Sequence, residues 1–277
     1  MKSTFFFLFL AGIIHTAKAQ FYYKDHLLPT HTAEQIKSYR EHRIRSVIAN
    51  SIESNREQSG SGLELKQTIN NNYSQLVTVT ASPVTGESTL TTWLNDKGLA
   101  IKTIDTTDGS GSTTTYSFND KNIIKTITNI TTSPGHADEK EEHQWFYNMD
   151  GKPERMWKIR NNRDTTHVTF EYDENGNVVE EKSRRLGKDL TTVYYYYDDQ
   201  NRLTDIVRYN PVAKRLLPDY IFEYNSTGKL RSMIVIPAGG NEYQRWIYTY
   251  DQRGLKIKET IMNRTKQIIG TVEYRYD

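Results

Sequence analysis

The stretch that decides the fold is Tyr248-Thr249-Tyr250-Asp251-Gln252-Arg253-Gly254-Leu255, one copy of a short motif that recurs along the chain. In each of seven copies an Asp or Asn opens a four-residue segment that ends on Gly or Asn, an apolar residue precedes the opener, and an eighth copy begins at Asp277. A repeat of about 20 to 50 residues indicates an array of similar structural units. The openers are Asn95, Asn119, Asn148, Asp173, Asp198, Asn225, Asp251 and Asp277, at spacings of 24, 29, 25, 25, 27, 26 and 26 residues.

Each copy predicts a β-hairpin. Asp or Asn at the first position of a type I turn accepts hydrogen bonds from later backbone N–H groups, and Gly or Asn best tolerates the positive φ at the fourth position. Side chains one and three places before the opener are mostly aromatic, and a period of two places them on one face of a sheet. These pairs are Tyr116 and Phe118, Trp145 and Tyr147, Phe170 and Tyr172, Tyr195 and Tyr197, Phe222 and Tyr224, Tyr248 and Tyr250, and Tyr274 and Tyr276.

The later copies resemble a known family. Tyr195-Tyr196-Tyr197-Asp198-Asp199-Gln200-Asn201-Arg202-Leu203 and Phe222-Glu223-Tyr224-Asn225-Ser226-Thr227-Gly228-Lys229-Leu230 are similar to the Tyr-Asp (YD) repeat of Rhs-type proteins, roughly Tyr-x-Tyr-Asp-x-x-Gly-Arg-Leu. The resemblance covers about residues 90–277 and fades in the first two copies, where Leu94 and Phe118 replace the usual Tyr. It implies a run of antiparallel hairpins, which in large Rhs proteins forms a shell around a toxin. This chain is much shorter, lacks the self-cleaving Asp-Pro core motif and has no toxin domain after Asp277, so encapsulation is not expected.

The first 19 residues predict a secretory signal peptide. Lys2 is followed by an apolar stretch over residues 5–14 and by Ala17-Lys18-Ala19, which fits an Ala-x-Ala cleavage site ahead of Gln20. The chain holds no Cys, so neither a lipid-modified Cys nor a disulfide is expected. We therefore expect an exported bacterial protein, secreted, periplasmic or at the cell surface, with no transmembrane segment after cleavage.

The charge balance narrows the choice of partner. Removing Lys2 and Lys18 takes the basic residues from 36 to 34, against 34 acidic ones, so the formal charge becomes 0. A neutral surface argues against nucleic acid. A membrane-spanning barrel is disfavoured because its strands keep one face apolar, whereas the returning strands place Glu180 and Lys182 on one face and Glu181 on the other.

A different element precedes the repeats. Thr32 and Gln35 form a possible capping box, and apolar residues recur at helical spacing up to Ile52, which predicts one amphipathic helix over about residues 33–55. Residues 54–62 then indicate a linker, and residues 63–90 predict two strands or a degenerate hairpin. The expected domains are a signal peptide over 1–19, a helix and linker over 20–62, and a β-hairpin repeat domain over 63–277.

Two sets of side chains are candidate sites. Aromatic residues outside the regular columns should face the opposite side of the sheet and are the candidates for a carbohydrate or peptide contact: Trp93, Phe146, Trp157, Tyr194, Tyr196 and Tyr209. The weak metal candidates are His136, Asp138 and His143, which lie in a charged segment without a recognisable ligand spacing. Nucleophile, zinc and phosphate-binding motifs are absent, so the sequence predicts no catalytic residue and no cofactor.

These observations predict an all-β fold. We expect about 14 to 17 antiparallel strands in a long, coiled meander of YD-like hairpins, since open sheets beyond about ten strands do not stay flat. The expected function is a non-enzymatic binding or scaffold module of the bacterial envelope, with a protein or glycan partner. The alternatives are a hydrolase of a surface polysaccharide, with two carboxylates about 5 to 10 Å apart, and an accessory or remnant of an Rhs-type toxin-delivery system.

Overall fold

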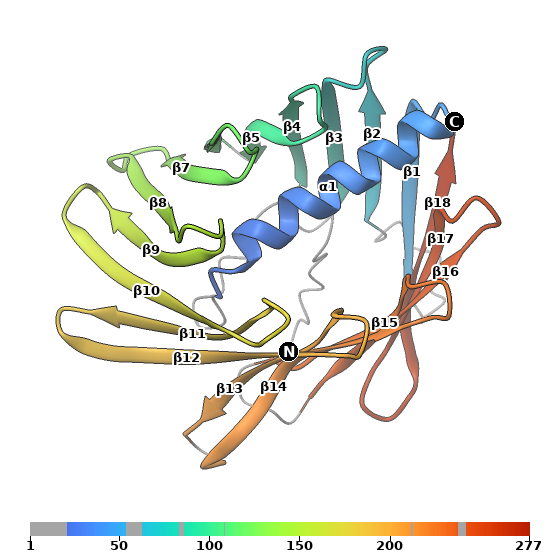
Figure 1. Ribbon diagram of the computed structural model, residues 1–277. Helices are drawn as coiled ribbons and strands as arrows, with labels where there is room; N and C mark the ends of the chain where they lie inside the picture. Colours follow the sequence, from blue (N-terminus) through green and yellow to red (C-terminus); the bar gives the residue numbers. More distant parts are fainter. Residues whose placement is uncertain (1–20, 54–62, 83–85, 108, 212, 238–241) are drawn as a thin grey trace.

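The computed structural model describes residues 21–53, 63–82, 86–107, 109–211, 213–237 and 242–277. The expected signal peptide (1–19) and linker (54–62) therefore lie outside the described residues. Within these ranges the chain forms one helix and one sheet of eighteen antiparallel strands (Figure 1). The elements are α1 (Lys24–Glu41), β1 (Ser46–Glu53), β2 (Glu64–Ile69), β3 (Gln75–Ser82), β4 (Gly86–Leu94), β5 (Ala100–Thr107), β6 (Ser110–Phe118), β7 (Ile124–Thr132), β8 (Glu139–Tyr147), β9 (Pro153–Arg160), β10 (Asp164–Tyr172), β11 (Val178–Arg185), β12 (Lys188–Tyr197), β13 (Leu203–Asn210), β14 (Arg215–Tyr224), β15 (Leu230–Val235), β16 (Gln244–Tyr250), β17 (Lys256–Met262) and β18 (Ile268–Tyr276).

The sheet closes into a barrel, which corrects the open, coiled meander of YD-like hairpins that the sequence predicts. Strands β2 to β18 pair in chain order, and β1 then pairs with both β18 and β2. At the seam, Ser46 and Asp277 exchange two backbone hydrogen bonds of 2.9 Å. Closure pairs both ends of the meander, where free strand edges would invite pairing with other chains. The all-β class and the antiparallel order are confirmed.

The expected helix over residues 33–55 is also wrong. The observed helix α1 starts earlier, and the second half of the expected helix forms strand β1 instead. α1 ends at Glu41, and Arg43 then takes a φ of 58°, which helical residues do not adopt. In β1, Val47 and Ala49 are buried on one face while Ile48 points to the other, as the period of a strand requires. Thr32, expected to cap the helix, lies inside it and donates to the Leu28 carbonyl at 3.0 Å.

The predicted turns form in all seven complete copies of the motif. Their fourth residues have positive φ, from 56° at Asn201 to 85° at Gly176. The opener's side chain accepts backbone hydrogen bonds as expected; Asp198 Oδ1, for example, lies 3.0 Å from the N atoms of both Gln200 and Arg202. Asn70 makes the same turn, with Tyr73 at a φ of 56°, so the array starts one period before Asn95.

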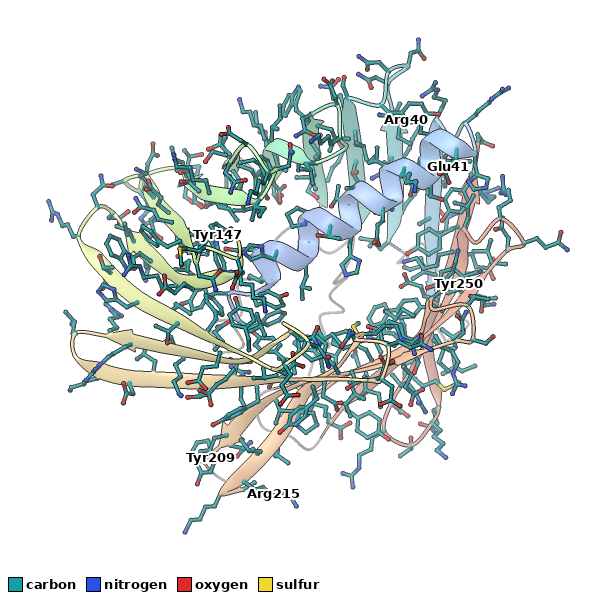
Figure 2. The ribbon with its side chains drawn as sticks, in the orientation of Figure 1. Arg40, Glu41, Tyr147, Tyr209, Arg215 and Tyr250 are labelled. Atoms are coloured by element: carbon teal, nitrogen blue, oxygen red, sulfur yellow. The ribbon has the colours of Figure 1, made fainter. Side chains whose placement is uncertain are left out.

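In six copies a tyrosine precedes the opener and links its hairpin to the hairpin before it. The tyrosine hydroxyl donates to a backbone carbonyl at the start of the returning strand of the preceding copy. A Lys or Arg side chain of that preceding copy can also lie over the tyrosine ring. Arg202 Cζ, for example, is 4.6 Å from the Tyr224 ring centroid. Figure 2 labels two of these tyrosines, Tyr147 and Tyr250. The six links are Tyr147 to Ile124, Tyr172 to Pro153, Tyr197 to Val178 (2.9 Å), Tyr224 to Leu203 (2.8 Å), Tyr250 to Leu230 (2.8 Å) and Tyr276 to Lys256 (2.6 Å).

Aromatic side chains line the inside of the barrel, and the outer face carries many polar side chains. Tyr195 is 2% exposed, and the other aromatic residues three places before an opener are buried or packed against the core. The outward face carries ion pairs such as Lys182 with Glu171 (2.9 Å) and Lys258 with Glu273 (3.1 Å).

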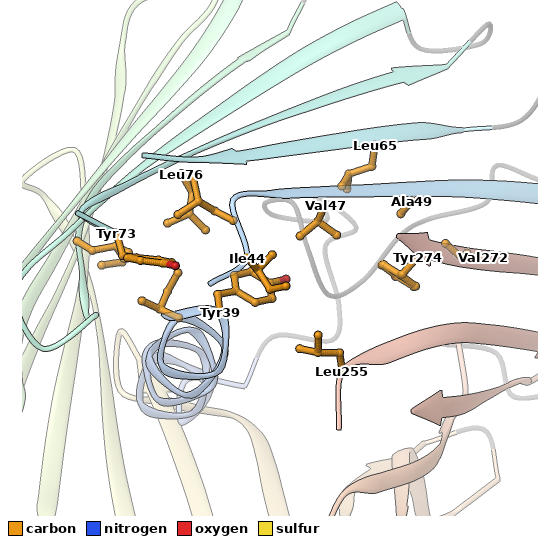
Figure 3. Packing of buried hydrophobic residues seen from close by; sticks show 14 residues of the cluster. Tyr39, Ile44, Val47, Ala49, Leu65, Tyr73, Leu76, Leu255, Val272 and Tyr274 are labelled. Carbon is orange, nitrogen blue, oxygen red and sulfur yellow. The ribbon is translucent and has the colours of Figure 1, made fainter. Parts of the chain in front are cut away.

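The helix lies against the interior of the barrel, near the end that holds the turns opened by Asp or Asn (Figure 1). Ile36 and Tyr39 of α1 pack with Val47, Leu65 and other inward side chains of β1 to β3 and β18 (Figure 3). At the β4–β5 turn, a Cβ on Gly98 would lie 3.4 Å from Ile36, so the turn and the helix are in close contact. α1 therefore buries its apolar face against the inner aromatic and aliphatic surface.

We predict that Tyr224→Phe lowers the free energy of unfolding by about 1 kcal/mol, because it removes one partly buried hydrogen bond and keeps the ring. Urea denaturation measures the change. Tyr196→Phe is the matched control, because Tyr196 is on the outer face and 48% exposed; it should change stability by less than about 0.5 kcal/mol. Equal effects of the two substitutions would contradict a stabilising role for these links.

Candidate functional site

Four side chains form an aromatic and basic cluster on the outer face of β8, β9 and β10. Phe146 and Trp157 have ring centroids 4.8 Å apart, and the His167 ring lies 5.8 Å from Trp157. The Arg155 guanidinium is 4.8 Å from the Phe146 centroid and 5.9 Å from that of Trp157. We call Phe146, Arg155, Trp157 and His167 the outer cluster.

Strand register explains why the outer cluster forms. Phe146 pairs with Arg155 across β8 and β9, and Trp157 pairs with His167 across β9 and β10. Trp145 and Met156, which neighbour these residues along β8 and β9, point inward and are buried. Phe146 and Trp157 are half-buried, whereas Arg155 and His167 are exposed.

The other predicted aromatic candidates do not join this cluster. The Lys102 ammonium lies over the ring of Trp93 on β4, 5.4 Å from the ring centroid. Tyr194 and Tyr196 lie on β12 with outward partners Val207 and Asp205. Tyr209 is 55% exposed and lies beside Arg215 at the far end of the β13–β14 hairpin (Figure 2).

A buried polar network holds the start of the helix inside the barrel. The carboxylate of Glu181 on β11 accepts hydrogen bonds from the backbone N–H groups of Tyr22 (2.9 and 3.0 Å) and Tyr23 (3.0 Å) and from the Tyr195 hydroxyl (2.7 Å). α1 has no side-chain cap of its own. Glu181 therefore places negative charge next to the helix N-terminus, where the helix dipole favours it.

A second part of this network centres on His143. Its Nδ1 lies 2.6 Å from Asp25 Oδ2, and its Nε2 lies 3.1 Å from Glu141 Oε1. Trp145 Nε1 also donates to Asp25, at 3.2 Å, and Lys158 pairs with Glu141 at 2.8 Å. Both ring nitrogens of His143 thus face carboxylates, so the geometry favours the doubly protonated imidazolium.

The pKa shifts agree with this protonation state. Burial opposes charge on His143, but the Asp25 and Glu141 carboxylates outweigh it and raise the pKa of His143 to about 9. Burial likewise opposes charge on the two acids. The His143 charge nevertheless lowers the pKa of Asp25, and His143 with Lys158 lowers the pKa of Glu141 to about 2. Burial raises the pKa of Glu181.

The metal candidates are not brought together. His143 faces the interior, as its position two residues before Trp145 predicts, whereas His136 and Asp138 are exposed in the loop between β7 and β8. Among the described residues, no group of three or more His, Asp or Glu side chains is placed to hold a metal ion. The carboxylates of Asp25 and Glu141 are both hydrogen-bonded to His143.

Several residues of these sites lie outside the sequence-based candidates. Arg155 and His167 share an outward face with Trp157, and applying the period of two to the returning strands would have found them. Asp25 had no such signal, because it contacts His143 across 118 residues of sequence.

We predict that the unfolding free energy falls by about 2 to 3 kcal/mol between pH 6.5 and 9.5 through His143. The folded pKa of about 9 exceeds the ordinary 6.5, so this stabilisation is complete below pH 6.5 and is lost as the pH rises through 9. Urea denaturation at several pH values measures the slope. His143→Gln should flatten it and the outer-face control His167→Gln should keep it; an unchanged slope in His143→Gln would contradict the assignment.

Known proteins give no family for this chain: no family model and no curated protein matches it. Among solved structures, a porin-like protein from Bacteroides uniformis aligns with 84% of this chain and 98% of its own length, at 11% identity and a TM-score of 0.41. The TcdB2-TccC3-Cdc42 complex and the Tc holotoxin pore of Photorhabdus luminescens each align with 76% of this chain at 14% identity, with TM-scores of 0.35 and 0.34. This chain spans 12% and 11% of those two chains. Likeness at this level assigns no function, and the YD-repeat resemblance stays a prediction.

Within the part of the chain that the structure describes, no helix combines the length and apolar character needed to cross a membrane.

Proposed function

We propose that this protein is an exported, non-enzymatic binding module of the bacterial envelope that holds a saccharide on its outer cluster. The observation that carries the proposal is the outward placement of Phe146 and Trp157 side by side, with ring centroids 4.8 Å apart. In a water-facing barrel wall, two adjacent half-buried rings offer an apolar surface on which a sugar ring can stack.

Polar groups beside the rings support this choice of ligand. Gln144 is the outward partner of Trp157 on β8, and Arg155 and His167 flank the two rings. Sites for small molecules combine apolar and aromatic surface with a few polar groups that fix orientation. Hydroxyl groups of a saccharide can bond to these amide, guanidinium and imidazole groups while the ring stacks.

The inner aromatic columns suit a structural role instead. Their rings are buried or packed in the core, and their hydroxyls are used between hairpins. The buried network of Glu181, Asp25 and His143 likewise holds α1. We therefore assign ligand contact to the outer face, because α1 does not pack against the side chains there.

We predict that Trp157→Ala weakens saccharide binding at least about fivefold, because loss of one stacking ring costs about 1 to 3 kcal/mol. Isothermal titration calorimetry with a panel of soluble envelope and plant oligosaccharides measures this without depending on the removed fluorophore. Trp93→Ala is the matched control on β4 and should bind as the unaltered protein does.

Equal loss in Trp157→Ala and Trp93→Ala would show that binding does not use the outer cluster. No binding to any saccharide of the panel would overturn the proposal itself. The toxin-delivery alternative makes a separate demand, since it requires a toxin or immunity gene beside the gene for this chain.

A further inference from the structure

Arg155 is an available cation in the middle of the outer cluster. Its guanidinium lies over the Phe146 ring and near the Trp157 ring, on an exposed side chain. Two outward carboxylates on neighbouring strands have cationic partners at 2.9 Å: Glu142 pairs with Lys140, and Glu171 pairs with Lys182. Within the described part of the chain no ion pair involves Arg155, so the positive charge beside the two rings can meet a charge brought by a ligand.

A guanidinium in this position favours a carboxylate over other groups. Its planar fork of donors matches the two oxygens of a carboxylate, and such charge-assisted bonds are about twice as strong as neutral ones. Contact with two aromatic faces restricts the side chain and excludes part of its water, which strengthens an ionic contact made there. The exposed His167 ring, 5.8 Å from Trp157, adds a second polar group on the same side.

We infer that the saccharide bound by the outer cluster is acidic, with its ring stacked on Trp157 and its carboxylate paired with Arg155. This inference rests on the proposed function and names its ligand class. A nucleic acid fits less well, because binding to phosphate chains draws on many Lys and Arg residues together, whereas neighbouring Lys140, Lys182 and Arg184 already pair with carboxylates.

Matched ligands test the inference. Hexuronate oligomers and the same oligomers with their carboxyl groups reduced to alcohols differ only in charge, so calorimetric titration with both isolates the carboxylate. We expect the acidic oligomer to bind at least tenfold more tightly at 50 mM salt, and the advantage to shrink at 500 mM. Arg155→Gln should remove the advantage, because it weakens binding of the acidic oligomer more than it weakens binding of the neutral oligomer.

Arg275→Gln is the control, because Arg275 is an exposed cation on β18, remote from β9 along the sheet order; it should retain the preference. Thermal unfolding of each variant verifies that the barrel persists. Equal affinity for the acidic and reduced oligomers, or an unchanged preference in Arg155→Gln, overturns this inference and leaves the proposed function standing. If neither oligomer binds, the inference is overturned, and titration with the wider saccharide panel then decides the proposed function.

Discussion

Backbone pairing of β1 with both β2 and β18 is the constraint on which the rest of the structure depends. A meander of seventeen strands has two edges, and each edge exposes N–H and C=O groups that need partners. β1 supplies partners to both, from Ser46 to Glu53. Because the ring is closed, one face of every strand must look inward, and the aromatic columns have a single space to fill.

The helix and the buried charges follow from that enclosed space. α1 precedes the closing strand by only a few residues, so the segment that closes the ring also carries the helix into the barrel. Burying the start of a helix leaves polar groups to satisfy, and Glu181 accepts from the backbone just ahead of it. Asp25 enters with the helix and meets His143, which explains why these two charged side chains lie inside a largely apolar interior.

Local patterns predicted the local features of this fold, and pairing between distant segments escaped them. Asn201 at a φ of 56° and buried Tyr195 follow from turn chemistry and a period of two. The segment from Val47 to Ile52 fits both helical and strand spacing, and only its long-range pairing with β18 decides between them. The same division holds for the sites. Phe146 and Trp157 were predicted to face outward, but their proximity to each other and to Arg155 depends on the register of β8 and β9.

Cross-linking across the seam tests closure most directly. The chain has no Cys, so Asn50→Cys combined with Glu273→Cys places two thiols at positions paired between β1 and β18. We expect rapid formation of an intramolecular disulfide on oxidation of the native protein, and no such bond for Asn50→Cys with Lys258→Cys, whose strands are separated by β18 and whose Cα atoms are too far apart to be bridged. Failure of the first pair to cross-link, or cross-linking only between molecules, would contradict the closed barrel.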